Sequence, residues 1–540
     1  MTVYFSYSNN FCEKSCPLNY KWLYLQKLQK KLAEQHSMKY PVGIQDFKSI
    51  INGGYVYVDK TALIHKLLDE GKIYFLSRPR RFGKSLLVST LEYYFKGEKE
   101  LFQGLAIEKL EKNWETYPVF LIDFNSTDFT DGQALRNKLM AYVSEWEDHY
   151  GVVPVTGQGV GDRFAHVLEH IHNTTGKRSV VLIDEYDKPL LDVLDTGYRT
   201  KGTNGEDILI EEYNRNILKG FYSTFKAADA HLQFVLLTGV TKFSQVSVFS
   251  GFNQPADISM DRRFEALCGI TKDEMLRDFK PEINKLADYE GCTFDEAVAQ
   301  LTAYYDGYHF SRRNMVDVFN PFSLINALAD SDLKNYWASS GATSLLPKFV
   351  DDMELKLRDF DPCPIIRQTI ETSDVTGGGA ELFLYQSGYL TIKDYQMGVY
   401  ILGFPNQEVR QALYETVLPA LTLRSNSNIQ SVQSGLLLAL QLGNLPEAMK
   451  CLKALVADVP YSNKKLASMD MEERYRLILS TIFNAIGCRV EVEKMIATGR
   501  IDMVVETIHI IYVLELKLSN NGGIDAAAEQ IRSQQYAEPF

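Results

Sequence analysis

The sequence has no apolar run that approaches the roughly 20 residues needed to cross a bilayer. Its N-terminus also has no apolar segment followed by a small-residue cleavage site, so it carries no recognisable secretion signal. Both absences predict a cytoplasmic protein with no membrane partner. The seven cysteines are scattered, and only Cys12 and Cys16 lie close together. Because no second ligand pair accompanies them, a zinc site is not expected. We expect the cysteines to be reduced thiols instead.

The sequence also lacks a basic excess, since its net charge is −12. The molecule as a whole therefore repels nucleic acid, and any contact with DNA or RNA needs a local basic surface. Hydrophobic residues make up 45% and charged residues 23% of the chain, which is ordinary globular composition. A length of 540 residues is typical of three or four domains.

The pattern changes along the chain, which divides it into four expected regions. Residues 1–37 form an N-terminal extension, and one explanation is that Met38 is the true start. Residues 38–270 alternate short apolar strands with amphipathic helices, which is typical of a parallel α/β sheet. Residues 271–440 are interpreted as a helical lid and connecting region, and 441–540 as a small α/β domain. The expected strands of the sheet are Ile73–Leu76, Val119–Phe124, Val180–Ile183 and Phe234–Leu237, with a helix over Ser85–Phe95.

A candidate phosphate-binding loop lies between the first strand and this helix. Such a loop directs backbone N–H groups and a helix N-terminus at an anion. Gly83 allows close backbone approach, Lys84 would reach the β- and γ-phosphates of ATP, and Ser85 would ligate Mg²⁺. The usual pattern begins with Gly, and Arg78 stands there instead. The alternative is a basic turn capped by a serine. The predicted nucleotide-binding residues are Arg78, Arg81, Phe82, Gly83, Lys84, Ser85 and, further along the chain, Thr238.

The expected third strand ends in two acidic residues. Asp184 at that strand end would hold Mg²⁺, and Glu185 would polarise the attacking water. An acidic strand end that caps the following turn is the alternative interpretation. Thr238, after the last strand, is the candidate sensor of the γ-phosphate. Arg262 and Arg263 are candidate arginine fingers, which would require a homo-oligomer if they act in trans, or they are solvated surface residues.

Five segments together resemble the AAA-ATPase-like family that is common in gut Bacteroidetes and other anaerobes. The family starts near the equivalent of Met38 and also has Arg in place of the first loop Gly. The resemblance implies a P-loop fold with a catalytic glutamate, and ATP with Mg²⁺ as cofactors. The segments are 40–47 (YPVGIQDF), 57–61 (YVDKT), 78–85 (RPRRFGKS), 182–187 (LIDEYD) and 305–310 (YDGYHF).

A second constellation lies near the C-terminus. Residues two apart on a strand point to the same face, so Glu515 and Lys517 share a face. Asp502 lies on the preceding strand, and a tight turn near Glu506 would bring it opposite them. Two converging carboxylates bind a hard divalent cation, and a neighbouring lysine can help to deprotonate a metal-bound water. The alternative is a strand with a solvated charged face.

The segments around this constellation resemble the PD-(D/E)XK nuclease domain that is usually fused to this ATPase. They are 497–505 (ATGRIDMVV), 512–517 (YVLELK) and the helix around Gln530. The resemblance implies that Asp502, Glu515 and Lys517 are catalytic and that Glu472, with Glu473 as the alternative, is a further metal ligand. Relatives continue past the equivalent of Phe540 into another strand, so the domain is expected to be truncated.

The leading hypothesis from the sequence is an ATPase coupled to a metal-dependent nuclease that acts on DNA or RNA. A second hypothesis is an ATP-dependent switch or scaffold whose nuclease-like domain is inactive and only binds a partner. A third is a nucleotide-binding remnant without turnover, against which Glu185 argues.

Overall fold

The chain folds into two compact units in the computed structural model. The larger unit comprises residues 39–333 and 362–405, and the smaller unit is formed mainly by residues 406–540. The structure describes residues 39–154, 157–202, 205–242, 255–312, 316–338, 361–372, 379–421, 426–457, 470–517 and 523–540. The expected N-terminal extension 1–37 lies outside these ranges. None of the described helices has both the length and the apolar composition needed to cross a membrane.

A five-stranded sheet forms the centre of the larger unit, and every neighbouring pair in it is parallel. The order β2-β3-β6-β1-β7 places β6 between β1 and β3. All four strands expected from the apolar runs are present, and the short β7 is added at one edge. The strands are β1 (Ile73–Ser77), β2 (Val119–Asp123), β3 (Ser179–Asp184), β6 (Leu232–Gly239) and β7 (Ala256–Asp257).

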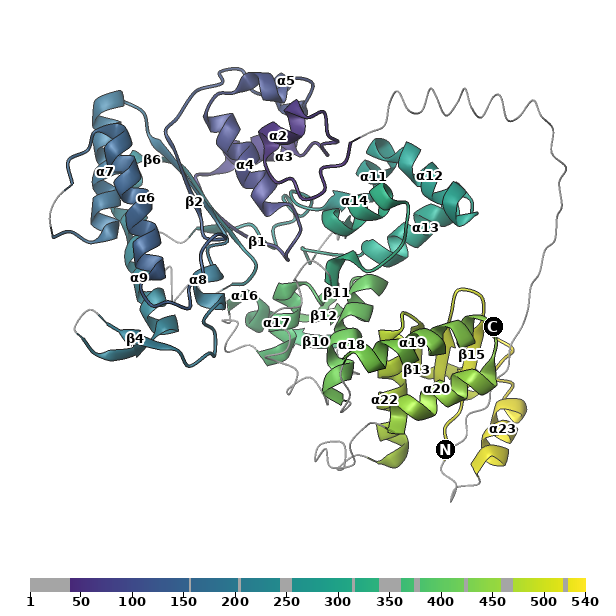
Figure 1. The fold of residues 1–540 in the computed structure, drawn as a ribbon. Coiled ribbons are helices and arrows are strands. Elements are labelled where there is room, and N and C mark those ends of the chain that lie inside the picture. Colours follow the sequence, from purple (N-terminus) through teal and green to yellow (C-terminus); the bar gives the residue numbers. More distant parts are fainter. Residues whose placement is uncertain are drawn as a thin grey trace, which may run out of the picture. The chain divides into compact units, whose positions relative to one another are not determined.

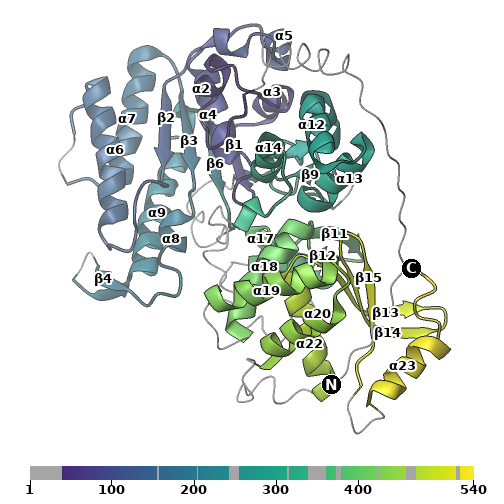
Figure 2. The same ribbon diagram turned by 45° about the vertical axis from the view of Figure 1, so that its right-hand side comes forward.

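Helices cover both faces of this sheet (Figures 1 and 2). This cover explains why β3 is buried along its whole length and why its sequence is a continuous apolar run. One face carries α6 (Ala134–Tyr150), α7 (Val160–Thr175) and α9 (Ile210–Ala227); the other carries α2 (Phe47–Asn52), α3 (Thr61–Glu70) and α4 (Lys84–Phe95). The short helices α5 (Ala106–Leu110) and α8 (Lys188–Leu191) and a hairpin of β4 (Arg199–Lys201) and β5 (Asp207–Leu209) complete this part.

The rest of the larger unit is a helical cluster and a small antiparallel sheet. Capping boxes at Thr271 and Thr293 start two of the helices. The helices are α11 (Lys272–Asp278), α12 (Lys280–Glu290), α13 (Phe294–Tyr305) and α14 (Pro321–Asp330), beside a bridge of β8 (Ile270–Thr271) and β9 (Val318–Phe319). The sheet contains β10 (Cys363–Ile366), β11 (Thr391–Gln396) and β12 (Val399–Gly403), next to α16 (Arg367–Thr372) and α17 (Gly379–Ser387).

The region 271–440 therefore differs from its mostly helical interpretation. The sheet was not expected because its strands are short, and β10 alternates buried and exposed residues instead of forming an apolar run. The region also contributes to both compact units, since residues from 406 onward belong to the smaller one.

The smaller unit packs helices around a three-stranded antiparallel sheet of order β13-β14-β15. Helices α22 and α23 lie on opposite sides of this sheet (Figure 2). The helix, the strands and the final helix follow the expected order. The elements are α18 (Gln407–Leu421), α19 (Asn426–Gln441), α20 (Leu445–Ala457), α22 (Met471–Ala485), β13 (Arg489–Ile496), β14 (Gly499–Glu506), β15 (Ile511–Leu514) and α23 (Gly523–Ser533).

Asp306, in the segment 305–310, makes the stability of the larger unit depend on pH. Its side chain is buried, and burial, reinforced by Asp317, raises its pKa from 3.8 to about 6. Below pH 3.8 this carboxyl group is protonated in the folded and the unfolded chain, so the raised pKa does not lower the free energy of unfolding. Between pH 3.8 and about 6 the free energy of unfolding decreases, and above about pH 6 this decrease is constant. We expect Asp306→Asn to raise the melting temperature at pH 8 and to have no such effect at pH 3.5. An equal shift at both pH values, measured by calorimetry, would contradict this account.

Candidate functional sites

The candidate phosphate loop connects β1 to α4 and closes on its own lysine. Gly83 has a φ of +86°, a conformation that suits glycine, and it is the N-cap of α4. Lys84 is 6% exposed, and its Nζ donates to the carbonyl oxygens of Arg78 at 3.0 Å and Pro79 at 3.1 Å. Burial lowers the pKa of Lys84, while Asp184 and Glu185 act in the opposite direction. The loop thus closes around the buried ammonium group of Lys84.

The side chain of Arg78 supports this loop from within the protein. It is 1% exposed, and Nη1 donates to the carbonyl oxygens of Ser77 at 3.0 Å and Ser259 at 2.6 Å. The guanidinium also stacks over the ring of Phe310, 3.9 Å from its centroid. With its side chain held in this way, Arg78 would reach a nucleotide through its main chain only. The arginine that replaces the usual first glycine therefore joins the loop to the segment 305–310.

The next loop residues divide between surface and core. Arg81 is exposed at a φ of +69°, with its guanidinium 5.0 Å from the ring centroid of Phe322. Phe82 is buried against Tyr308, with 4.7 Å between the ring centroids. Ser85 is half-buried in the first turn of α4. The loop thus turns Phe82 inward and exposes Arg81 at the surface.

Asp184 is the last residue of β3 and Glu185 follows it, so this acidic pair lies at the same end of the parallel strands as the loop. The Thr238 hydroxyl donates to Oδ1 of Asp184 at 2.6 Å, and the main-chain N–H of Glu185 donates to the same oxygen at 3.0 Å. Thr238 is fully buried, so its hydroxyl orients the Asp184 carboxylate. Because β6 lies between β1 and β3, Thr238 stands between the loop strand and the acidic strand.

Glu185 has an unusual backbone conformation and a perturbed carboxyl group. Its φ is +52°, which costs free energy in a residue other than glycine and is often found at functional sites. Burial raises the pKa of Glu185, and Lys84 partly offsets this. A half-buried carboxylate with a raised pKa is a better proton acceptor than an exposed one.

Asp187 fixes the turn that carries Glu185. Its buried carboxylate accepts from the main-chain N–H groups of Val240 at 2.9 Å and Thr241 at 2.6 Å, and from the Thr241 hydroxyl at 2.7 Å. Tyr186 donates its hydroxyl to the carbonyl oxygen of Thr241 at 2.8 Å. The turn is therefore bonded to the end of β6. Tyr186 and Asp187 therefore complete the segment 182–187 as residues of the turn.

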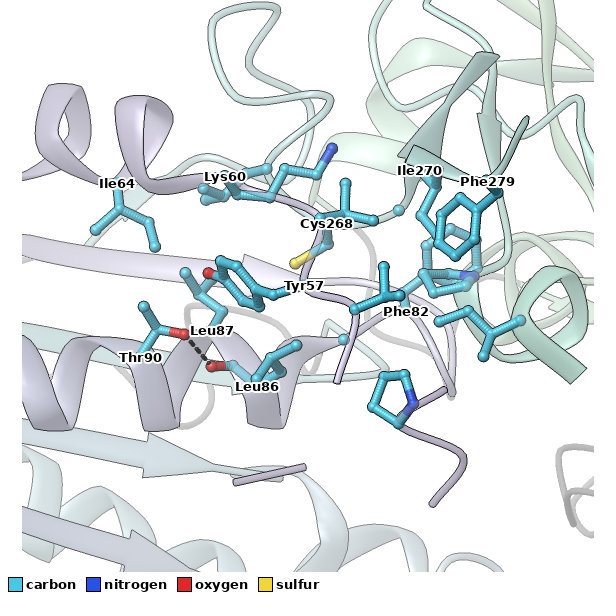
Figure 3. A pocket seen from close by; sticks show the side chains of 18 residues that line it. Tyr57, Lys60, Ile64, Phe82, Leu86, Leu87, Thr90, Cys268, Ile270 and Phe279 are labelled. Atoms are coloured by element: carbon cyan, nitrogen blue, oxygen red, sulfur yellow. Dashed lines mark hydrogen bonds between the residues drawn. The ribbon is translucent and has the colours of Figure 1, made fainter. Parts of the chain in front are cut away.

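An apolar pocket opens beside Gly83 in the larger unit (Figure 3). It has about 620 Å³ of empty volume, part of it open to solvent. Lys60 lies at this pocket and is paired with Glu274, with Nζ 2.5 Å from the carboxylate. The labelled lining residues are Tyr57, Lys60, Ile64, Phe82, Leu86, Leu87, Thr90, Cys268, Ile270 and Phe279. The pocket is lined mainly by apolar and aromatic side chains, which is typical of ligand pockets.

The segment 57–61 contributes Tyr57, Val58 and Lys60 to this pocket. Asp59 lies just before Lys60, the N-cap residue of α3, and accepts the main-chain N–H of Thr61 at 2.8 Å. Its other oxygen accepts the N–H of Ala106 at 2.7 Å. Asp59 thus joins the starts of α3 and α5. The aromatic and apolar residues of the segments 40–47 and 57–61 were the only indication of the pocket that these segments offered in the sequence.

In the smaller unit, the C-terminal carboxylates and lysine lie together. Nζ of Lys517 is 3.1 Å from Oε1 of Glu515, and Oδ2 of Asp502 accepts the main-chain N–H of Leu516 at 2.8 Å. Glu515 is 1% exposed and its Oε2 has no hydrogen-bond partner. Burial, reinforced by Asp502, raises the pKa of Glu515 to about 7. A buried carboxylate oxygen without a donor, next to a second carboxylate, fits a divalent cation.

Glu472 stands apart from this pair. It lies in the first turn of α22, where its main-chain N–H is bonded to the N-cap Asp470. Among the residues that the structure describes, no three His, Cys, Asp or Glu side chains gather closely enough to hold a metal ion. The contact from α22 to the site comes instead from Arg476, whose Nη2 is 3.4 Å from Oδ1 of Asp502.

Neither candidate arginine finger contacts the loop in the described geometry. Arg262 is exposed, and Arg263 is held by ion pairs to Glu70 at 2.6 Å and to Asp261 at 2.5 Å.

The parallel sheet, the loop closed on Lys84 and the acidic end of β3 define a P-loop NTPase fold. The smaller unit adds a restriction-endonuclease-like arrangement of sheet, carboxylates and lysine. Comparison with known proteins agrees: residues 41–249 match a family described as "Predicted AAA-ATPase", and residues 470–540 match the PD-(D/E)XK nuclease superfamily.

A protein of Azotobacter chroococcum mcd 1, described as "Uncharacterized protein in vnfD 5'region", is 35% identical over 520 residues, covering 93% of each chain. The chain therefore belongs to the same family as this protein, and it joins an AAA-ATPase-like domain to a PD-(D/E)XK nuclease-superfamily domain. Both resemblances drawn from the sequence are confirmed.

Two solved structures show a remote likeness. Orc1 of Aeropyrum pernix, in complex with DNA, is 11% identical, with 67% of this chain and 93% of that chain covered and a TM-score of 0.23. Cdc6p from Pyrobaculum aerophilum is also 11% identical, with 66% and 92% covered and a TM-score of 0.23.

Proposed function

We propose that the larger unit binds ATP with Mg²⁺ and hydrolyses it. In this account Lys84 and the loop N–H groups hold the β- and γ-phosphates, while Ser85 and Asp184 hold the Mg²⁺. Glu185 accepts a proton from the attacking water, and Thr238 keeps Asp184 oriented. The observation that carries the proposal is geometric: β6 lies between β1, which leads into the loop, and β3, and the Thr238 hydroxyl at the end of β6 donates to Asp184 at 2.6 Å.

The apolar pocket beside Gly83 would hold the adenine ring. It adjoins the loop that would hold the phosphates, so one nucleotide can occupy both. Substitution of Ile325, a half-buried lining residue on α14, by Trp is expected to fill the pocket and to weaken ADP binding by roughly tenfold or more. Ala329→Trp, at an exposed position of the same helix, is the matched control. Equal ADP affinity of both variants in titration calorimetry would contradict the binding of the adenine ring in this pocket.

We further propose that the smaller unit cleaves nucleic-acid phosphodiesters with a divalent cation. Asp502 and Glu515 would hold the cation, which supplies an activated water and charge stabilisation when bound. Lys517 would orient that water. The proposal is supported by the buried Oε2 of Glu515, which lacks a donor, and by the ion pair of Glu515 with Lys517. Glu472 remains a candidate third ligand that would have to move toward the pair.

One experiment tests both activities and separates them from a scaffold role. Purified protein is incubated with ATP, Mg²⁺ and a mixture of DNA and RNA, and phosphate release and strand cleavage are measured together. We expect both. Nucleotide binding without cleavage in either Mg²⁺ or Mn²⁺ would favour the alternative, an ATP-dependent scaffold whose nuclease-like domain binds a partner.

A further inference from the structure

Strand β13 has a local irregularity at an acidic residue without an assigned role, Glu493. Val492 pairs with Met503 and Lys494 pairs with Ile501, so the register is unchanged and Glu493 lies opposite Asp502 of β14. Its φ is +54°, a strained conformation for a residue with a side chain. Strained residues of this kind are often found at functional sites. The turned side chain meets Arg476 of α22, with Nη1 2.6 Å from Oε1 of Glu493.

Arg476 connects Glu493 to Asp502. Its side chain is 10% exposed, and its Nη2 contact with Asp502 is long, at 3.4 Å. Its Nε is buried without a hydrogen-bond partner. A buried guanidinium with an unsatisfied donor and one weak contact retains binding capacity for an anion, because a planar arginine fork matches phosphate oxygens.

The charges around the site favour a phosphodiester as that anion. Asp502, Glu515 and Glu493 supply negative charges, while Arg476, Lys517 and Arg500 supply positive ones. A divalent cation on the Asp502–Glu515 pair would shift this balance toward positive charge, which favours an anionic phosphodiester. The exposed Arg500, 3.4 Å from Glu493, lies at the edge of the same cluster.

We propose that Arg476 binds the phosphate of the nucleic-acid strand next to the Asp502–Glu515 pair, and that Glu493 positions Arg476 for this contact. The inference rests on the proposed nuclease function. Arg476 pairs with Asp502 while no cation neutralises that carboxylate, and it turns to the phosphate when one does. Glu493 holds the guanidinium in both arrangements.

The test measures metal binding and nucleic-acid binding separately on the full chain. For Arg476→Gln we expect Mn²⁺ binding, followed by titration calorimetry, to be as tight as in the wild type or tighter, because a competing positive charge is lost. The affinity for an oligonucleotide, measured in Ca²⁺, should fall by roughly tenfold. The slope of this affinity against salt concentration should correspond to about one fewer phosphate contact. Glu493→Gln should weaken oligonucleotide binding less, and Arg476→Lys should restore part of it. Arg489→Gln, an exposed ion-paired residue of the same strand, is the control.

The outcomes distinguish the roles of these residues. Unchanged oligonucleotide affinity and salt dependence in Arg476→Gln would overturn the inference while the nuclease proposal stands. Parallel loss of Mn²⁺ binding and of thermal stability would show that Arg476 is only a structural counter-ion, which also overturns it. A wild-type chain that binds neither Mn²⁺ nor an oligonucleotide would overturn both proposals.

Discussion

Replacement of Glu185 by Gln is expected to reduce ATP hydrolysis by about 10²–10⁴-fold while ATP binding stays within a few fold of the wild type. The amide keeps the size of the side chain, so the turn at φ +52° and the loop around Lys84 should be preserved. It cannot accept the proton of the attacking water, so only the chemical step is lost. The rate of phosphate release and the affinity for a fluorescent ATP analogue measure the two effects independently.

The matched control for this variant is Glu212→Gln, an exposed glutamate in the first turn of α9. It should hydrolyse ATP at the wild-type rate. If Glu185→Gln turned over ATP as fast as this control, the proton acceptor would have to be another group. Loss of binding together with hydrolysis would instead mean that Glu185 supports the shape of the site.

Lys517→Ala is expected to reduce the rate of nucleic-acid cleavage by about 10²-fold or more and to leave the rate of ATP hydrolysis unchanged. Lys517 contacts Glu515 and would orient the water to be activated. Its removal deprives that water of an orienting group, whereas the proposed ATP site lies in a different compact unit. Strand cleavage and phosphate release from the same reaction provide the two readouts.

Lys494→Ala is the control for this second variant, because Lys494 lies on β13 and pairs with Glu491 at 2.9 Å, away from Glu515. It should cleave at the wild-type rate. Cleavage that persisted in Lys517→Ala would remove this lysine from the proposed mechanism. A loss of ATP hydrolysis in the same variant would show that the two activities depend on each other.

The parallel sheet could be predicted because β1, β2, β3 and β6 each contain a short apolar run that lies between amphipathic helices. The strand β7 could not, since Ala256–Asp257 is only two residues long and pairs with β1 through tertiary contact. The same limitation applies to β10, whose alternating burial leaves no apolar run in the sequence.

The candidate sites were predictable where local sequence sets the geometry. Lys84 and Ser85 follow Gly83 into a helix. Glu515 and Lys517 lie two residues apart just after β15, and their side chains are in contact, as their spacing indicated. The role of Arg78 could not be deduced in this way, because it depends on the carbonyl oxygen of Ser259 far along the chain.

The conformation of Glu493 gives a second example of this limit. Its φ of +54° is not indicated by the sequence around it, which alternates regularly between apolar and charged residues. The apolar pocket likewise combines residues from 41 to 325, so no single segment indicates it.

The most direct test of the central claim is the rate of phosphate release by the wild-type chain and by Lys84→Ala in ATP and Mg²⁺. The account predicts Mg²⁺-dependent hydrolysis by the wild type and none above background in the variant, because Lys84 is the buried cation at the centre of the loop. Equal hydrolysis by both proteins, or none by a folded wild type that binds ATP, would contradict it.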